Sequence, residues 1–456
     1  MAAGKGKRLK SRLPKVLHPL CGRPVLWHVL HAVRGARPDS IVVVVNHGRG
    51  EVEEALASWK LRFPVVFVDQ GQPLGTGHAV MVAEDAVAGA DDVLVVNGDE
   101  PLITGGALRR LVGTHRRRRA AATLQSTSVD DPGRFGHVVR EGDEFVRIVE
   151  GADATPAERA IEEVSMGIYV FRREDLFRAL PLVARDNRQR EYYLHDVLSV
   201  LRDKGERVVV HTVDNGRTVG VNNRADLARA AAVMRRRINE GHMAKGVTFI
   251  DPDTTYIDVD VRIARDAILL PQTYLEGRTR IGEGARVGPG TRVVDSTVGR
   301  DAEVQFSVVR ESRVGPRVSV GPYASIRPGT VLEEGAKAGT FVEIKKSRIG
   351  RGTKVPHLSY VGDASIGDEA NIGAGTVTVN YDGYDKHRTT IGQGARVGSD
   401  TMLVAPVRVG KRAWTGAGST ITRDVPEGAL GVERADQKVV RGYDERRAKA
   451  RKRRKG

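Results

Sequence analysis

The chain has 456 residues, of which 40% are hydrophobic and 29% charged, and a formal net charge of +16. This length allows about two or three domains with cores of their own, and the composition is ordinary for a globular protein. Because no apolar run approaches the roughly 20 residues that cross a bilayer, and none follows the basic N-terminal residues, we expect no membrane insertion and no signal peptide. The only cysteine, Cys21, excludes an intrachain disulfide and a zinc site of several thiolates, and it favours a cytoplasmic location.

The first half of the chain alternates short apolar runs with segments of helical character. Three runs of β-branched residues are typical of buried parallel strands: 41–45, 65–68 and 93–96. Three segments between or after them are expected to be helical: 51–60, 76–88 and 105–119. Strands that alternate with helices indicate an α/β domain with a Rossmann-like, doubly wound sheet, which we place at 1–221.

A connecting segment follows this domain. Leu227, Ala231, Met234 and Ile238 recur at the spacing of one helix face. We therefore predict a linker helix within residues 222–247.

The sequence from about residue 248 follows a six-residue repeat. An aliphatic residue, usually followed by Gly, recurs every six residues, as in 281–286 and 287–292, and the pattern continues to Val409-Gly410. Such a repeat predicts a parallel β-helix of hexapeptide coils, in which aliphatic side chains stack inside a prism and glycine occupies corners where a Cβ would be costly. We place this β-helix at 248–435.

The tail at 436–456 is strongly basic. It contains ten Lys or Arg and three Asp or Glu, which supplies +7 of the net charge. Since it has no apolar periodicity, we expect it to be disordered. A basic run of this kind can contact nucleic acid, but a solvated tail without a dedicated partner is the preferred interpretation.

Two segments near the N-terminus suit the binding of a nucleotide. Residues 2–8 form a glycine-containing loop with interleaved cations, and Lys15 follows in a Leu-Pro-Lys-Val-Leu segment. Backbone N–H groups and positive charge in such a loop suit a triphosphate. Gln70 and the Leu-Gly-Thr-Gly-His-Ala segment at 74–79 suit a second close backbone approach, to a base or a sugar.

Asp99 follows the apolar run at 93–96. Ligands in open α/β sheets bind outside the carboxyl ends of the strands, and a carboxylate there suits Mg²⁺ bound to phosphates. An isolated Asp at a strand end is more often a turn or cap residue, but the neighbouring loops favour a metal site.

Polar residues interrupt the β-helix repeat in its later coils. His357 and Tyr360 stand in the segment 354–360, which is followed by 371–376 and by an insertion at 379–383. Hexapeptide helices often serve only as scaffolds, and a lone histidine is commonly structural. In this setting His357 is the candidate general base, because imidazole titrates near neutral pH.

These motifs resemble those of the sugar-nucleotide pyrophosphorylases. Their order resembles the bacterial bifunctional enzymes that combine an N-acetylglucosamine-1-phosphate uridyltransferase (UDP-N-acetylglucosamine pyrophosphorylase) with a glucosamine-1-phosphate N-acetyltransferase. The resemblance extends from Ala2 to about Arg434 and implies a left-handed β-helix. It implies acetylation of glucosamine-1-phosphate by acetyl-CoA, then transfer of UMP from UTP to N-acetylglucosamine-1-phosphate. UDP-N-acetylglucosamine and pyrophosphate are the products, and the first of these feeds bacterial cell-wall synthesis.

The resemblance also implies roles for individual residues in the first half. Arg8 and Lys15 would stabilise charge on the reacting phosphates, and Asp99 with Asn222 would bind Mg²⁺. The other implied contacts, to the uridine nucleotide or the sugar, are Ala2, Ala3, Gly4, Gln70, Gly75, Thr76, Gly136, Glu150 and Ser165.

In the second half the resemblance assigns His357 to removing a proton from the glucosamine amine. The implied contacts to the sugar phosphate are Arg327, Lys345, Tyr360 and Asn371. The implied acetyl-CoA contacts are Ala374, Asn380, Tyr381, Ser399, Ala417 and Arg434. Related left-handed helices assemble as trimers with the site between subunits, so a homotrimer is expected.

Two features depart from the family pattern. The family's nucleotide loop follows a buried strand, whereas here it begins at residue 2, and Ser165 stands where the family usually has a sugar-binding Asn. A start placed too late is the preferred reading of the first departure. The alternatives are an acetyltransferase with an impaired N-terminal domain, a nucleotidyltransferase with a purely structural β-helix, and a non-catalytic regulatory subunit.

Overall fold

The computed structural model describes residues 1–454 apart from residues 5, 60, 62, 131, 133, 134, 152 and 214–219, and it gives no account of the side chains of Lys7 and Lys452. Lys5 of the predicted phosphate loop therefore lies outside the described residues. The chain forms two compact units, Met1–Ile238 and Asn239–Gly456.

The first unit alternates strands and helices as expected. Its strands and helices, in chain order, are β1 (Pro19–Leu20), β2 (Arg23–Pro24), α1 (Val25–Gly35), β3 (Val42–Val45), α2 (Arg49–Ser58), β4 (Val66–Asp69), α3 (Thr76–Met81), β5 (Asp92–Val95), α4 (Gly105–Arg118), β6 (Ala122–Ser128), β7 (Gly136–Glu141), β8 (Glu144–Glu150), α5 (Pro156–Arg159), β9 (Glu163–Arg172), α6 (Arg173–Ala179), α7 (Asp196–Asp203), β10 (Val208–Thr212) and α8 (Arg224–Met243). The unit boundary falls inside α8, so this helix belongs to both units.

The strands of the first unit form two main sheets. A six-stranded sheet runs β10-β6-β9-β7-β8 with β5 beside β9, and β3 pairs with β4 in a separate parallel sheet. The backbone of the N-terminal residues bonds to both, because the Met1 amine donates to the Val96 carbonyl at 2.8 Å and the Ala2 N–H donates to the Val44 carbonyl at 2.8 Å. These bonds hold the start of the nucleotide loop at the carboxyl ends of β3 and β5.

The sheets differ from the expectation of buried parallel strands. Strand β9 is antiparallel to both β5 and β6, so the larger sheet is mixed. In β4 the Val66 side chain is 47% exposed. Val66 is exposed because β4 lies at the edge of a sheet, where among the described residues it pairs only with β3.

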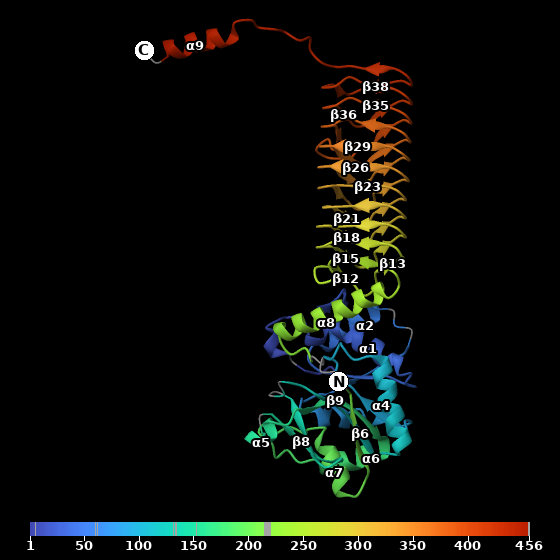
Figure 1. Cartoon of the computed structure of the whole chain (residues 1–456), viewed down its shortest axis with the longest axis vertical. Helices are drawn as coiled ribbons and strands as arrows, with labels where there is room; N and C mark the ends of the chain where they lie inside the picture. The colour runs from blue at the N-terminus through green and yellow to red at the C-terminus, as the bar shows by residue number, and fades with distance from the viewer. Residues whose placement is uncertain are drawn as a thin grey trace. The chain divides into compact units, whose positions relative to one another are not determined.

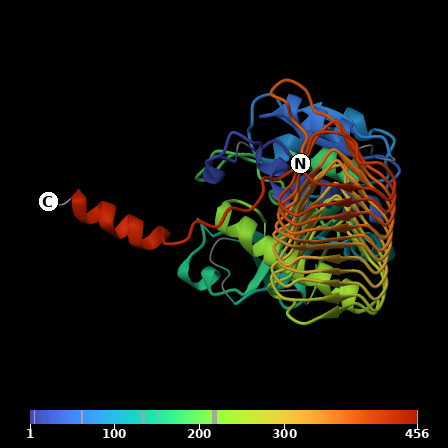
Figure 2. The same cartoon turned by 90° about the horizontal axis from the view of Figure 1, so that it is seen from above.

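The second unit is a left-handed parallel β-helix. Figure 2 shows the triangular outline of its coils. Thirty strands, from β11 (Thr248–Phe249) to β40 (Leu430–Gly431), form three parallel sheets of 11, 10 and 9 strands. Within each sheet, successive strands come from successive coils of the stack (Figure 1). Most strands expose one residue and bury the next, so stacked aliphatic side chains such as those of Ile281, Val287 and Val293 form the core.

Glycine in the repeat serves close packing between coils. A Cβ on Gly282 would lie 2.7 Å from the backbone of Gly299, and one on Gly299 would lie 2.6 Å from that of Gly315. Neither glycine has a positive φ, whereas several corners at positive φ carry larger residues such as Asp301 and Phe306. The repeat therefore needs glycine for the approach of one coil to the next.

The basic tail contains one helix among its described residues. Helix α9 (Tyr443–Arg453) occupies most of it, and its described side chains are exposed. Arg, Lys, Ala and Glu are strong helix formers, which explains a helix without an apolar face. Among the helices of the described ranges, none combines the length and apolar character needed to span a membrane.

Candidate functional sites

One cleft of about 1130 Å³ in the first unit brings together the thirteen residues of that half to which the family resemblance gives a role. Those that line it are Ala2, Ala3, Gly4, Arg8, Lys15, Gln70, Gly75, Thr76, Asp99, Gly136, Glu150, Ser165 and Asn222. They come from segments up to 220 residues apart in the chain, and the fold places them around a single space.

Two side-chain oxygens and two cations meet in this cleft. The Lys15 ammonium contacts the Asp99 carboxylate and lies 2.9 Å from Asn222 Oδ1. Arg8 donates to the same Asn222 oxygen at 3.0 Å. The Asp99 and Asn222 oxygens thus converge on a positive charge, as the donor set of a hard divalent cation must.

A glycine turn forms a second wall of the cleft. Gly75 has φ +110°, and a Cβ there would lie 2.6 Å from the Tyr192 carbonyl oxygen. Buried Gln70 donates from Nε2 to the Gly75 carbonyl at 3.0 Å, and the Thr76 hydroxyl accepts from the Leu194 N–H at 3.0 Å. The turn is therefore held by hydrogen bonds at both residues, and it lines the cleft.

We expect Gly75→Ala to damage this turn more than a glycine substitution nearby. In this variant an alanine would adopt a left-handed φ and its Cβ would collide with the backbone of Tyr192. The free energy of unfolding should fall by about 1–3 kcal/mol or more. Gly71→Ala is the matched control, because Gly71 has φ +63° but nothing within 4 Å of the position that a Cβ would take. Thermal unfolding and the KM for the nucleotide measure the effect. Equal losses in the two variants would contradict the assigned packing.

Gly136, Glu150 and Ser165 also line the cleft. A Cβ on Gly136 would lie 2.7 Å from Ile148 Cγ2, so the strand passes too close for a side chain. Burial raises the pKa of Glu150. The Ser165 hydroxyl accepts from the Gly167 N–H at 3.2 Å and lies 3.1 Å from the Tyr169 hydroxyl, so part of its hydrogen-bonding capacity is used within the protein.

Glu100 and Asn97 also line the cleft but were not predicted. Asn97 donates to Glu100 Oε1 at 2.9 Å, while Glu100 Oε2 is buried without a hydrogen-bond partner among the described residues. Burial, and next the neighbouring Asp99 carboxylate, raise the pKa of Glu100 to about 8. The sequence signal was the acidic pair Asp99-Glu100, of which only the first member was interpreted.

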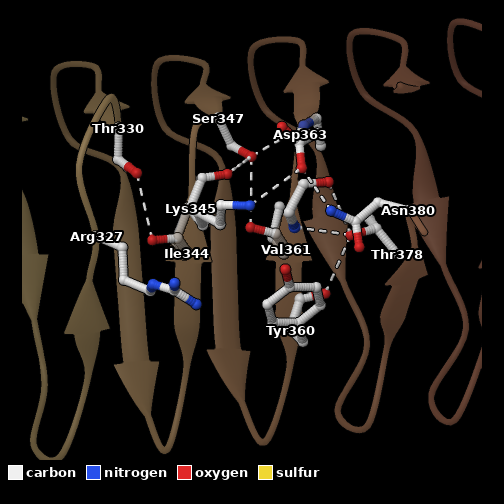
Figure 3. Close-up of polar contacts among 12 residues, drawn as sticks. Arg327, Thr330, Ile344, Lys345, Ser347, Tyr360, Val361, Asp363, Thr378 and Asn380 are labelled. Carbon is white, nitrogen blue, oxygen red and sulfur yellow. Dashed lines mark hydrogen bonds and ion pairs between the residues drawn. The ribbon is translucent and has the colours of Figure 1, made fainter. Parts of the chain in front are cut away.

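The second unit gathers polar residues on neighbouring coils of its ten-stranded sheet (Figure 3). Arg327 follows β24 (Ser325–Ile326), Lys345 ends β27 (Glu343–Lys345) and Tyr360 begins β30 (Tyr360–Gly362). Arg327 donates to Glu343 Oε1 at 2.6 Å. These successive strands therefore present two cations and a phenol on one face.

His357 stands next to this face. It ends β29 (Lys354–His357), and a two-residue corner leads from it to Tyr360. Its side chain is exposed, so a substrate can reach the imidazole.

Asp363 and Lys386 join the same group and were not predicted. Lys345 Nζ lies 3.7 Å from Asp363 Oδ2, which also accepts from Asn380 Nδ2 at 2.5 Å. The close approach of the Lys345 and Lys386 amines raises the pKa of Lys345 and lowers the pKa of Lys386. Only the fold could reveal these partners, because they come from the next coil and from the loop that follows it.

The remaining predicted residues lie on the later coils. Ala374, Ser399 and Ala417 follow β32 (Asn371–Ile372), β35 (Arg396–Val397) and β38 (Trp414–Thr415), which are successive strands of the eleven-stranded sheet. His357 has the same position one coil earlier, and Arg434 donates to the Ala417 carbonyl at 3.0 Å. Asn371 begins β32, and the half-exposed Tyr381 donates to the Gly383 carbonyl at 2.6 Å in the loop after Asn380.

A cleft of about 1130 Å³ in an α/β unit, followed by a β-helix with an exposed histidine, is the arrangement expected of a two-domain transferase. The model of the MobA-like NTP transferase domain family matches residues 1–193. A protein from Syntrophomonas wolfei is 47% identical over 440 residues, which cover 96% of this chain and 97% of that protein, and it is named bifunctional protein GlmU. Proteins of that name from Caldanaerobacter subterraneus and Listeria monocytogenes are 47% and 45% identical, covering 98% and 97% of this chain and 97% and 96% of theirs.

The chain therefore belongs to the GlmU family of bifunctional proteins. It is a bifunctional enzyme, a nucleotidyltransferase of the uridyltransferase type and an acetyltransferase. The resemblance, the fold class and the bifunctional activity predicted from the sequence are confirmed. The single-activity and regulatory alternatives find no support in these relatives.

Proposed function

We propose that the β-helix acetylates glucosamine-1-phosphate with acetyl-CoA and that the α/β unit then transfers UMP from UTP to the resulting N-acetylglucosamine-1-phosphate. The convergence of all thirteen predicted residues on one cleft supports the second reaction. The products are UDP-N-acetylglucosamine, a precursor for cell-wall synthesis, and pyrophosphate. We place the reactions in the domains 1–221 and 248–435, joined by the linker 222–247, in a cytoplasmic protein whose tail 436–456 has no catalytic role.

In uridyl transfer a phosphate oxygen of the sugar phosphate attacks the α-phosphorus of UTP, and pyrophosphate leaves as the bond to the β-phosphate breaks. Arg8 and Lys15 neutralise the charge on the phosphates, which is where most of the catalysis of such a transfer arises. Asp99 and Asn222 would hold Mg²⁺, which supplies further charge neutralisation when bound. The loop at Ala2–Gly4 and the turn at Gly75 would hold the nucleotide.

The sugar lies in this proposal between Gly136, Glu150 and Ser165. Glu150 would accept a hydrogen bond from a sugar hydroxyl. A hydrogen bond to a carboxylate is stronger than one between neutral groups. Ser165 retains a hydroxyl toward the cleft, but it is shorter than the Asn of the family.

In acetyl transfer His357 removes a proton from the glucosamine amine as the nitrogen attacks the thioester carbonyl. The C–S bond then breaks and the CoA sulfur takes up a proton. Arg327 and Lys345 would hold the phosphate and Tyr360 with Asn371 the sugar. The acetyl-CoA contacts would be Ala374, Asn380, Tyr381, Ser399, Ala417 and Arg434.

An exposed apolar ladder supports the expected homotrimer. Phe306, Tyr323, Phe341 and Leu358 occupy one corner of four consecutive coils and are 41–63% exposed. The Tyr323 and Phe341 rings stack with centroids 5.4 Å apart, and the Phe306 ring lies tilted with its centroid 5.7 Å from that of Tyr323. All four residues have positive φ, a costly conformation for large side chains. Leu358 is adjacent to His357, so a second copy of the chain seated on this ladder would border the acetyl-transfer site.

We expect Tyr323→Asp to dissociate the assembly and to reduce acetyl transfer while uridyl transfer persists. A carboxylate in the ladder would be buried unpaired between subunits, which an interface does not tolerate. Sedimentation equilibrium on the 49.5 kDa chain measures the oligomer. Leu182→Asp, at a 54% exposed position of the first unit, is the control. A trimer that survives Tyr323→Asp would rule out the ladder as its interface.

Separate half-reactions test the proposed function. UTP-dependent pyrophosphate release with N-acetylglucosamine-1-phosphate reports the first unit, and CoA release from acetyl-CoA with glucosamine-1-phosphate reports the second. Both should require their sugar phosphate. Absence of either release would overturn that half of the proposal.

A further inference from the structure

Asp226 lies in the wall of the uridyl-transfer cleft, yet the proposed mechanism gives it no role. It stands in the first turn of α8 and is 7% exposed. Its Oδ2 accepts the N–H of Asn222 at 3.0 Å and the N–H of Asn223 at 3.1 Å, and Asn223 Oδ1 accepts the Asp226 N–H at 2.9 Å. The two bonds between Asp226 and Asn223 form a capping box. The bond to the Asn222 N–H is additional, because Asn222 precedes the helix and a capping box does not include it.

The backbone held by Asp226 carries the catalytic amide. Asn222 donates from Nδ2 to the Gly220 carbonyl at 3.3 Å, which turns its Oδ1 toward the cations Lys15 and Arg8. The Val221 N–H donates to the Asp99 carbonyl at 2.8 Å. The segment 220–222 therefore carries one proposed metal ligand and is tied to the other.

Arg229 completes the arrangement. It contacts Oδ1 of Asp226 one helical turn later, so each carboxylate oxygen has its own task. Oδ1 is anchored to the helix, and Oδ2 is left to hold the two N–H groups. A rotation of the carboxylate would break contacts on both sides, which fixes its orientation.

We propose that Asp226 is a positioning residue for uridyl transfer. Its carboxylate holds the Asn222 backbone on the end of α8 so that the amide oxygen points to the reacting phosphates and their metal. The inference rests on the proposed function of this cleft. Removal of a group that orients a metal ligand in this way typically lowers metal affinity or activity by about 10–100-fold.

The test measures the binding of Mn²⁺ to the full chain in the presence of UTP. Mn²⁺ is paramagnetic, so electron paramagnetic resonance detects its binding directly. Asp226→Ala should raise the dissociation constant of Mn²⁺ about 10–100-fold and lower kcat, with the KM for the sugar phosphate changed by less than about two-fold. Asp226→Asn should recover most of the affinity, because its one carbonyl oxygen can still accept both N–H bonds.

Asp175→Ala is the matched control. Asp175 is 1% exposed in α6 and contacts Arg172 and Arg178, but it does not line the cleft. The Asp175→Ala substitution should reduce thermal stability without changing the affinity for Mn²⁺. Unchanged Mn²⁺ affinity in Asp226→Ala would overturn the positioning role, and Asp226 would then serve only to cap helix α8. A wild-type enzyme that binds Mn²⁺ with UTP but releases no pyrophosphate would instead overturn the proposed function.

Discussion

His357→Ala is expected to reduce acetyl transfer by about 10²–10⁴-fold, the usual contribution of a general base. The glucosamine amine carries a proton that must leave as the C–N bond forms, and the imidazole is exposed at the corner between β29 and β30, beside the face that carries Lys345. CoA release measured at saturating acetyl-CoA gives the loss in kcat. The KM for glucosamine-1-phosphate should change little, since the phosphate contacts are made by other side chains.

The same variant contains its own control. Uridyl transfer takes place in another unit of the chain, so pyrophosphate release from UTP and N-acetylglucosamine-1-phosphate should equal that of the wild type. His357→Ala that retained full acetyl transfer would exclude the histidine as the base. Equal loss of both activities would indicate misfolding rather than a catalytic effect.

Asp99→Asn is expected to lower uridyl transfer by about 10³-fold, in line with the removal of a preorganised charge from a reaction centre. The substitution keeps the size of the side chain and removes the negative charge that Lys15 contacts. The loss should be in kcat, and the metal concentration for half-maximal rate should rise, because a neutral amide binds a hard cation less well than a carboxylate. Pyrophosphate release across a Mg²⁺ titration measures both quantities.

Acetyl transfer by Asp99→Asn serves as the reference, and it should be unchanged. If the variant releases pyrophosphate at the wild-type rate and with the wild-type metal dependence, Asp99 is a structural residue at a strand end. That was the alternative open from the sequence alone.

The strongest sequence signals were those with a strict physical period. A six-residue repeat needs an aliphatic side chain in every coil, and residues such as Ile281 and Val287 are buried as the repeat predicts. The nucleotide motifs were predictable because a glycine loop and a strand-end carboxylate have few other uses in combination. Their convergence on one cleft followed from the topology of α/β sheets, in which the carboxyl ends of strands lie together.

The residues that sequence reasoning missed act through partners that only the fold brings together. Asp226 appears in the sequence as an ordinary helix-start residue, and its bond to Asn222 depends on the turn before α8. Asp363 meets Lys345 only because one β-helix coil stacks on the next.

The most direct test of a bifunctional enzyme is pyrophosphate release from UTP and glucosamine-1-phosphate, measured with and without acetyl-CoA. We expect release only when acetyl-CoA is present, preceded by release of CoA, since the α/β unit uses the sugar phosphate only after acetylation. Release without acetyl-CoA, or CoA release that is never followed by pyrophosphate, would contradict this order of reactions.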